Sequence, residues 1–441
     1  MNPISRATGL APIETRFRWV ILCVLFSFVL IVTLAHSAIA QALDPFLFET
    51  DLADEHRGLL LAGLGLGFII ASLPAGLVCD GYGARRVFMT AALLVAAGML
   101  LGGLSTRLST QLIACLLVGF GTGAILPAVI RSVADWFSPH EHAFVLGSVL
   151  AALPFGLGIA ALLMPWIIAF TGWRPTLWGA ALLVLAWLPL WTRLYTDDPA
   201  QSSRVSRSEL QRIGRLMTVR ERVQQQKAAV AEPRRSIAFF APATLFANTW
   251  AFMALGFALF FTAIWFDQRL LPHIATSSRL SSWAPGLPWL IAAPLIWLGG
   301  FISDRRLQTM GWLRQARTAV ILASTLLATI ALACLAAAAA TGAPSQTFLV
   351  SLICAAIGLI VSALPVLCAT IIDISKRNPA AVLGFSLAAS AGAGVAAPVV
   401  SHWIGERTGH PASPFLLLLA IQLATVVVLL VLHKPDHAAS R

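Results

Sequence analysis

The stretch GLVCDGYGARRV, residues 76–87, places a carboxylate and two guanidinium groups between two long apolar runs. Asp80, Arg85 and Arg86 carry the only charges in residues 58–104. Apolar runs of about 20 residues are long enough to cross the hydrocarbon core of a bilayer as helices. The stretch therefore predicts two membrane-crossing helices that are joined by a short charged turn at the membrane surface.

The whole chain has the composition of an integral membrane protein. It contains 441 residues, of which 58% are hydrophobic and 11% are charged, and its mean hydropathy is +0.84. A soluble globular protein carries about 25% charged residues. Because a soluble core of this length cannot bury so much apolar surface, we expect the bilayer to solvate most of the chain.

Twelve apolar segments meet the length that a membrane span needs. The first follows Arg16 and Arg18, as the apolar region of a signal peptide would, but it is too long for one, so we expect a retained helix. The expected spans are residues 19–42, 58–78, 87–105, 110–134, 143–170, 175–194, 237–266, 283–302, 316–340, 346–371, 381–404 and 413–432.

The basic residues indicate how the chain is oriented. The formal net charge is +11, and Lys and Arg are concentrated in the segments that lie on the same side as the N-terminus in this twelve-span arrangement. Because Lys and Arg favour the cytoplasmic side, we expect a multi-pass protein of a bacterial-type inner membrane with both termini in the cytoplasm. On this interpretation the charge orients the protein and does not indicate binding to nucleic acid.

A polar segment divides the chain into two parts. Residues 196–236 contain no apolar span, which predicts a cytoplasmic linker between an N-terminal six-helix bundle, residues 1–195, and a C-terminal six-helix bundle, residues 237–441. The linker stretch SELQRIGRLMTVRERVQQQK has apolar residues near helical spacing. It is either a short amphipathic helix on the inner membrane surface or a solvated connection.

The two halves resemble each other in sequence. VLG at 145–147 recurs at 382–384, and at the same offset Trp166-Ile167 recurs as Trp403-Ile404 and Thr171-Gly172 as Thr408-Gly409. Gly76 and Asp80 also recur, at a shorter offset, as Gly300 and Asp304. Each match is short, but the matches keep their order along the two halves. Parallel six-helix halves of this kind are typical of transporters.

Residues 76–86 resemble the signature loop of the major facilitator superfamily, with the spacing Gly76-x-x-x-Asp80-x-x-Gly83-x-Arg85-Arg86. The chain departs from that pattern at Gly81, where the family usually has Arg, although the second copy keeps this residue as Arg305. The resemblance covers the whole chain. It implies an all-α membrane protein with twelve transmembrane helices in two pseudo-symmetric six-helix bundles, the major facilitator fold. It also implies a secondary active transporter that works as a monomer by rocker-switch alternating access and needs no cofactor.

The charges of the motif are expected to form a conformational latch. A carboxylate at a helix end can face the positive N-terminus of a neighbouring helix. We expect Arg85 and Arg86 to pair with the acids that close helices 4 and 10, and the alternative is that they only obey the positive-inside rule. The expected latch residues are Gly76, Asp80, Gly83, Arg85, Arg86, Asp135, Asp304, Arg305 and Asp373.

Arg131 is a cation within the fourth expected span, about one turn from its inner end. Its surroundings, LPAVIRSVADWFSPHE, resemble the end of helix 4 in the organic-anion carriers of the superfamily, among them the anion:cation symporters. The resemblance makes Arg131 a candidate substrate contact, although it could instead snorkel to the surface or pair with Asp135. The symporters commonly carry Asp-Arg on helix 1 where this chain has Ala35-His36.

Four further polar residues within or near the ends of spans are candidate substrate contacts, because polar groups in a membrane are costly. His36 and Gln41 lie on the outer part of the first span, and each could instead be a buried polar group between helices. Asn248 lies near the middle of the seventh span and is expected to line a central cavity. His402 is a weaker candidate on the eleventh span.

The positions of the acidic residues do not single out a coupling ion. None of the 19 acidic residues lies near the middle of a span, which weakens proton symport without excluding it, since His36 or an acid at a helix end could carry a proton. The six cysteines form no CxxC pair or ligand cluster, so neither a metal site nor a disulfide framework is expected.

Together these features predict a transporter for a small organic anion such as a carboxylate. The alternatives are a drug or metabolite efflux carrier and a transporter-like sensor that does not turn over. GSVLAALPFGLGIAALLMP lacks the Gly-Pro of the helix-5 signature of drug:proton antiporters, which disfavours efflux. An enzyme is not expected, because no motif brings a nucleophile, a base and oxyanion donors together and there is no phosphate-binding loop.

Overall fold

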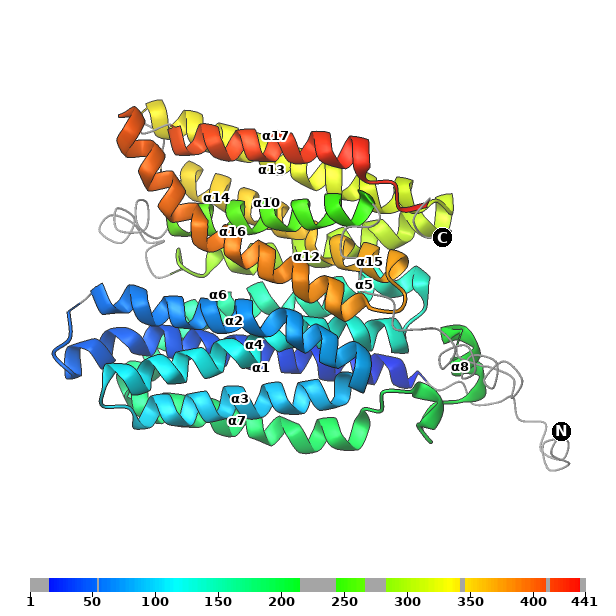
Figure 1. Ribbon diagram of the computed structural model, residues 1–441, viewed down its shortest axis with the longest axis horizontal. Helices are drawn as coiled ribbons and strands as arrows, with labels where there is room; N and C mark the ends of the chain where they lie inside the picture. Colours follow the sequence, from blue (N-terminus) through cyan, green and yellow to red (C-terminus); the bar gives the residue numbers. More distant parts are fainter. Residues whose placement is uncertain are drawn as a thin grey trace, which may run out of the picture.

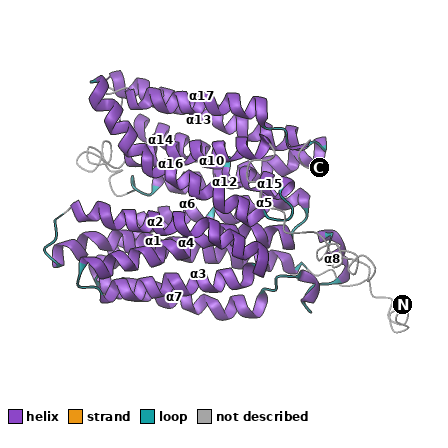
Figure 2. Ribbon diagram, viewed as in Figure 1, coloured by secondary structure: helices purple, strands orange, loops and turns teal. Residues whose placement is uncertain are grey.

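The computed structural model describes residues 16–53, 55–214, 243–265, 283–341, 346–409 and 413–436. These residues form helices joined by turns and loops, with no strand among them (Figure 2). Twelve of the helices in these ranges are long and apolar enough to cross a membrane. The expectation of an all-α membrane protein with twelve spans is confirmed.

The N-terminal bundle contains the first six spans. Its fifth span is made of two helices that follow each other with only Ala151 between them. The bundle is held by contacts of the second and third spans with the fourth, and of the first span with the fifth and sixth. Its helices are α1 Phe17–Glu49, α2 Glu55–Tyr82, α3 Ala84–Leu104, α4 Leu108–Trp136, α5 His142–Leu150 with α6 Ala152–Thr171, and α7 Trp173–Leu194.

The C-terminal bundle contains the other six spans. Its tenth span is again divided into two helices, and its ninth begins with a short π-helical turn, η5 Arg314–Thr318. A short helix, α8 Arg207–Ile213, lies in the expected linker. The bundle helices are α10 Ala243–Trp265, α12 Leu287–Met310, α13 Ala319–Thr341, α14 Gln346–Ser362 with α15 Leu364–Ile374, α16 Pro379–Thr408 and α17 Ser413–Leu432.

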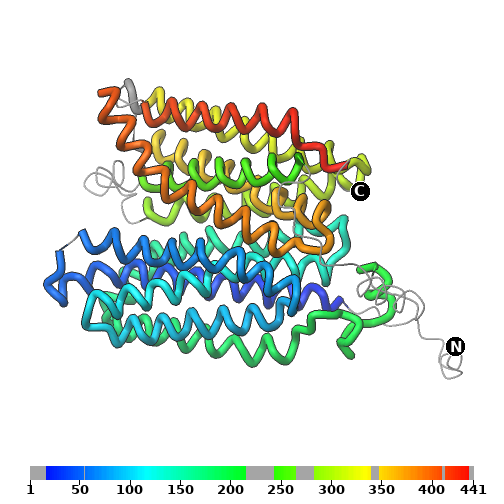
Figure 3. Tube along the Cα trace, in the orientation of Figure 1, coloured from blue at the N-terminus to red at the C-terminus, as the bar shows by residue number. Residues whose placement is uncertain are grey.

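The two bundles lie side by side (Figure 1), and several helices of one pack against helices of the other. α2 packs against α16, and α12 packs against α5 and α6. We call the two ends of the molecule the Asp80 end and the Glu49 end. α2 and α16 lie together at the Asp80 end, and α16 then tilts away toward the Glu49 end (Figure 3).

Several helices extend beyond the spans expected from hydropathy. α12 continues eight residues past the expected end at 302, so Asp304 and Arg305 lie on its last turns and not in a loop. Hydropathy marks only the part of a helix that hydrocarbon surrounds, whereas backbone hydrogen bonds let the helix continue into the polar region. The seventh span was expected from residue 237, and residues 237–242 lie outside the described part of the chain.

Candidate functional site

The Asp80 carboxylate joins the two bundles. Its Oδ1 accepts a hydrogen bond from the backbone amide of Ala380 at 3.3 Å, and its Oδ2 accepts one from Ala381 at 2.8 Å. These amides lie in the first turn of α16, where unpaired N–H groups and the helix dipole favour a negative charge. Gly76 makes this approach possible, because a Cβ there would collide with the Ala380 carbonyl.

Asp304 makes the corresponding contact in the opposite direction. It lies on α12 of the C-terminal bundle, and its Oδ2 accepts a 2.6 Å hydrogen bond from the amide of Phe144 in the first turn of α5. Gly300, one helical turn earlier, leaves no room for a Cβ beside the Ala143 carbonyl. Each bundle therefore uses a Gly-x-x-x-Asp helix end to cap a helix of the other bundle, as the sequence repeat of Gly76 and Asp80 indicates.

Arg131 supports the first of these caps. Its Nε lies 2.9 Å from Asp135 Oδ2, and its Nη1 lies 3.6 Å from Asp80 Oδ1. Its side chain is one-quarter exposed, whereas both carboxylates are buried. Of the roles considered for Arg131, the structure shows the pairing with Asp135, within the network of charges at the Asp80 end.

Arg317, which lies outside the repeated motif, supports the second cap. It lies in η5 and is fully buried, with Nη1 2.6 Å from Asp304 Oδ1 and Nε 3.0 Å from Asp373 Oδ2. Nη1 also donates to Ser303 Oγ at 3.0 Å. The available signal was the basic stretch RRLQTMGWLRQAR, residues 305–317, but its length hides which Arg turns inward.

The partners expected for Arg85 and Arg86 are wrong. The Arg85 amide donates to Asp197 Oδ1 at 2.9 Å, and its Nη2 donates to the Thr192 carbonyl at 2.6 Å, so Arg85 is held within its own bundle. Arg86 and Arg305 are exposed. The physical reason is that α3 begins directly after the turn at Gly83, which directs Arg85 toward the end of α7 and away from Asp135 and Asp373.

Gly83 is required by this turn. Its φ of +91° lies in a region that L side chains rarely adopt, and a Cβ would come 2.5 Å from the Asp197 carboxylate. Asp436 repeats the role of Asp197 in the other bundle, because its carboxylate accepts from the amides of Leu313 and Arg314 at the start of the ninth span. The sequence signal for both was an acid a few residues after the last span of each half.

A linker residue also caps a span. Glu209 on α8 is buried, and its carboxylate accepts hydrogen bonds from the amides of Phe17 and Arg18 at 3.2 and 3.0 Å. Arg18 in turn lies 3.2 Å from Glu141. The described part of the linker therefore docks on the bundle at the start of α1, and residues 215–236 lie outside the described chain.

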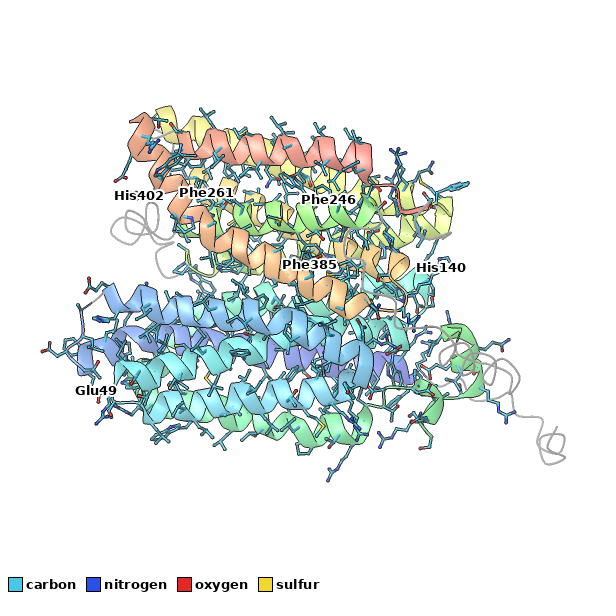
Figure 4. All side chains as sticks on the ribbon, viewed as in Figure 1. Glu49, His140, Phe246, Phe261, Phe385 and His402 are labelled. Carbon is cyan, nitrogen blue, oxygen red and sulfur yellow. The ribbon has the colours of Figure 1, made fainter. Side chains whose placement is uncertain are left out.

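The remaining candidate substrate contacts are spread through the molecule. Gln41 donates to the Ala160 carbonyl at 3.3 Å, so it joins α1 to α6. Asn248 is fully buried and donates to the Leu367 carbonyl at 3.3 Å, between α10 and α15. His402 lies on the surface near the Glu49 end, 3.2 Å from Glu406 (Figure 4). The structure does not bring these three residues together.

His36 differs from the other candidates in its surroundings. Its side chain on α1 is half-buried, and no hydrogen bond ties it to another residue that the structure describes. Among the candidate contacts, it is therefore the one whose side chain has no polar partner within the described chain.

Comparisons with known proteins agree with this arrangement. A family model for the Major Facilitator Superfamily matches residues 20–323. A probable sulfoacetate transporter, SauU, of Cupriavidus necator is 26% identical over 411 residues, which cover 88% of this chain and 90% of that protein. The hexuronate transporter of Bacillus subtilis is 23% identical over 391 residues, 87% of each protein.

A solved structure has the same fold. The proton:xylose symporter XylE, bound to 6-bromo-6-deoxy-D-glucose, superposes with a TM-score of 0.74 and 15% identity over 96% of this chain and 98% of that one. The twelve spans, the repeated Gly-x-x-x-Asp helix ends and the match over residues 20–323 lead to one conclusion. The chain belongs to the major facilitator superfamily of membrane transporters.

Proposed function

We propose that this protein is a secondary active carrier of a small organic anion, such as a carboxylate, and that it works by rocker-switch alternating access. The observation that carries this proposal is the pair of caps between the bundles, from Asp80 to α16 and from Asp304 to α5. The names of the relatives support the substrate class, since sulfoacetate and hexuronates are small organic anions.

The two caps serve as a latch that closes the Asp80 end. Each links a carboxylate of one bundle to backbone amides of the other, so both must break when the bundles rock apart at this end. Arg131 and Arg317 belong to the same bundles as Asp80 and Asp304, and they keep each carboxylate paired after the latch opens. This lowers the cost of opening, because a buried carboxylate without a partner is strongly destabilising.

His36 is the proposed polar contact for the substrate. A neutral imidazole can donate to a carboxylate, and a protonated one adds a charge. Arg131 is engaged by Asp80 and Asp135 while the latch is closed, so in this state it is a latch residue. Anion symporters commonly carry an Arg on helix 1 where this chain has His36. A histidine at this position fits a carrier in which a titratable group contacts the anion.

We place the Asp80 end in the cytoplasm of a bacterial inner membrane, with both termini on that side. The described residues at this end include many basic side chains, which the positive-inside rule favours. These are Arg16, Arg18, Arg85, Arg86, Arg305, Arg306, Arg314, Arg317, Lys376 and Arg377. A single chain supplies both halves of the latch, which is consistent with a working monomer.

Uptake into proteoliposomes tests the proposal. Purified protein is reconstituted and uptake of labelled sulfoacetate and glucuronate is measured, after a thermal-shift screen against carboxylates, sulfonates, phosphates and apolar cations. A transported anion stabilises the native state by mass action and accumulates inside the vesicles. We expect His36→Ala to abolish the shift, while the control variant His56→Ala, which changes a half-buried histidine at the start of α2, keeps it.

Two results would overturn this proposal in different ways. Stabilisation by apolar cations alone, with no response to anions, would favour an efflux carrier. Binding of an anion without any uptake would favour a sensor that does not turn over.

A further inference from the structure

His142 lies where the two bundles meet. It is the first residue of α5, only 4% of its surface is exposed, and it faces Asp373 on α15 of the other bundle. Its Nε2 lies 3.2 Å from the Phe137 carbonyl, and its Nδ1 lies 3.8 Å from Asp373 Oδ1. Nδ1 is buried and has no hydrogen-bond partner among the described residues.

The two ring nitrogens have different roles in this geometry. A carbonyl oxygen only accepts hydrogen bonds, so the short contact with Phe137 requires the proton on Nε2. In a neutral ring Nδ1 then carries a lone pair, and this lone pair faces the Asp373 carboxylate. A second proton on Nδ1 would replace that unfavourable contact with a charge-assisted hydrogen bond between the bundles.

The charges around His142 leave a place for a positive charge. On the C-terminal bundle, the single Arg317 guanidinium is shared by two carboxylates, those of Asp304 and Asp373. On the side of the N-terminal bundle, the nearby charges occur mainly as pairs of opposite sign. At this end of the molecule, the titratable and charged groups on the elements that pack against α5 are Arg18 on α1, Arg131 and Asp135 on α4, His140 and Glu141 on the preceding turn, Asp304, Arg305 and Arg306 on α12, and Asp373 on α15. Arg317 in η5 joins them through its ion pairs with Asp304 and Asp373.

We propose that His142 Nδ1 is a proton-binding site whose occupation closes the Asp80 end of the protein. The proton comes from water, adds to the Nδ1 lone pair and is shared with Asp373. When the bundles separate at this end, His142 leaves Asp373 and returns to water, and the proton is released there. Acidification therefore favours the state that is closed at the Asp80 end. This inference rests on the proposed alternating access and does not depend on the identity of the substrate.

A distance measurement by electron paramagnetic resonance tests this inference in the full-length protein. Spin labels are placed on Tyr82→Cys at the end of α2 and Lys376→Cys before α16, two exposed sites on opposite bundles. The two exposed native cysteines, Cys23 and Cys334, are replaced by alanine. The populations of short and long distances are recorded between pH 8 and pH 5.5 without substrate.

We expect the ratio of the short to the long distance to rise on acidification. The rise is limited by how much closure strengthens proton binding at His142: each tenfold increase in proton affinity allows up to about a tenfold rise in the ratio. His142→Gln should remove this dependence, since Gln cannot be protonated. His142→Arg should hold the short distance at every pH. His140→Gln, which removes an exposed histidine two residues away, is the matched control and should behave as the unsubstituted protein does.

The inference is overturned if His142→Gln retains the full pH response or if the distances do not respond to pH at all. Uptake of an anion by the same protein in either case would leave the proposed function intact. A pH response that is lost in His142→Gln, in a protein that transports nothing, would support the inference and count against the proposed function.

Discussion

At the scale of single residues, Arg131 and Arg317, which pair with the carboxylates of the two caps, differ in how far water reaches them. Arg317 is fully buried between Asp304 and Asp373, whereas Arg131 is one-quarter exposed beside Asp80 and Asp135. Removing one partner of a buried ion pair leaves a charge that nothing neutralises. Near the surface, water and salt compensate for much of this loss.

We therefore predict that Arg317→Met costs about 3–5 kcal/mol of unfolding free energy, as breaking a buried pair does. Arg131→Met should cost clearly less, because water can hydrate the carboxylates that remain. Denaturant unfolding in detergent, followed by tryptophan fluorescence, compares the two variants. Equal losses would show that burial does not distinguish these sites.

His433 is a buried histidine whose protonation is linked to the stability of the folded protein. It follows α17, is fully buried, and its Nδ1 lies 2.7 Å from Thr318 Oγ1. Burial, with a contribution from the Arg314 guanidinium, lowers the pKa of His433 from 6.5 to about 4. The folded protein therefore binds this proton more weakly than the unfolded chain does. The stability from a neutral His433 is fully present above pH 6.5 and is lost as the pH falls toward 4.

We predict that this residue makes the protein less stable by up to about 3 kcal/mol between pH 6.5 and pH 4. His433→Gln should flatten that part of the stability curve. Melting temperatures of both proteins across this pH range give the difference. Parallel curves would mean that His433 is protonated at little cost in the folded state.

At the scale of elements, carboxylates from elsewhere in the chain cap the starts of several helices. Some caps act within a bundle, as Asp197 does for α3, and others act between bundles, as Asp80 does for α16. Both kinds contribute through hydrogen bonds and the helix dipole, at roughly 1 kcal/mol each. They differ in what they stabilise: the first kind holds one bundle together, and the second selects one arrangement of the two bundles.

The variants Asp80→Asn and Asp197→Asn separate these roles. We predict that Asp80→Asn lowers the ratio of closed to open molecules at the Asp80 end by about fivefold, which corresponds to roughly 1 kcal/mol. Asp197→Asn should lower the melting temperature and leave that ratio unchanged. The distance between spin labels at positions 82 and 376 measures the ratio. A change of the ratio in both variants would contradict the distinction between the two kinds of cap.

At the scale of the whole molecule, the orientation in the membrane can be tested directly. Phe48 at the Glu49 end is 91% exposed, and Tyr82 at the Asp80 end is 63% exposed. If the Asp80 end is cytoplasmic, an impermeant maleimide should label Phe48→Cys in intact cells and Tyr82→Cys only after lysis. The reverse pattern would invert the proposed orientation and the side on which the His142 proton is released.

Much of the molecule could be predicted from the order of its residues. The twelve spans follow from local hydropathy, because each helix satisfies its own backbone hydrogen bonds within the bilayer. Asp80 and Asp304 could be found because the Gly-x-x-x-Asp pattern repeats. Arg317 could not be found in this way, because its role depends on two carboxylates that only the fold brings to it. Asp373 on α15 is distant in the sequence, and Asp304 on α12 is separated from Arg317 by a long basic turn.

The sequence by itself determined the membrane as the solvent, the number of spans, their division into two related halves and the repeated acidic helix ends. Only the tertiary structure decided which cation meets which carboxylate, that Asn248 and Gln41 are tied to backbone carbonyls of their own bundles, and that His142 faces Asp373 across the interface. The physical reason is one of range. Hydropathy and helix formation depend on neighbours along the chain, whereas charge pairs within a few ångströms depend on how whole helices are packed and turned.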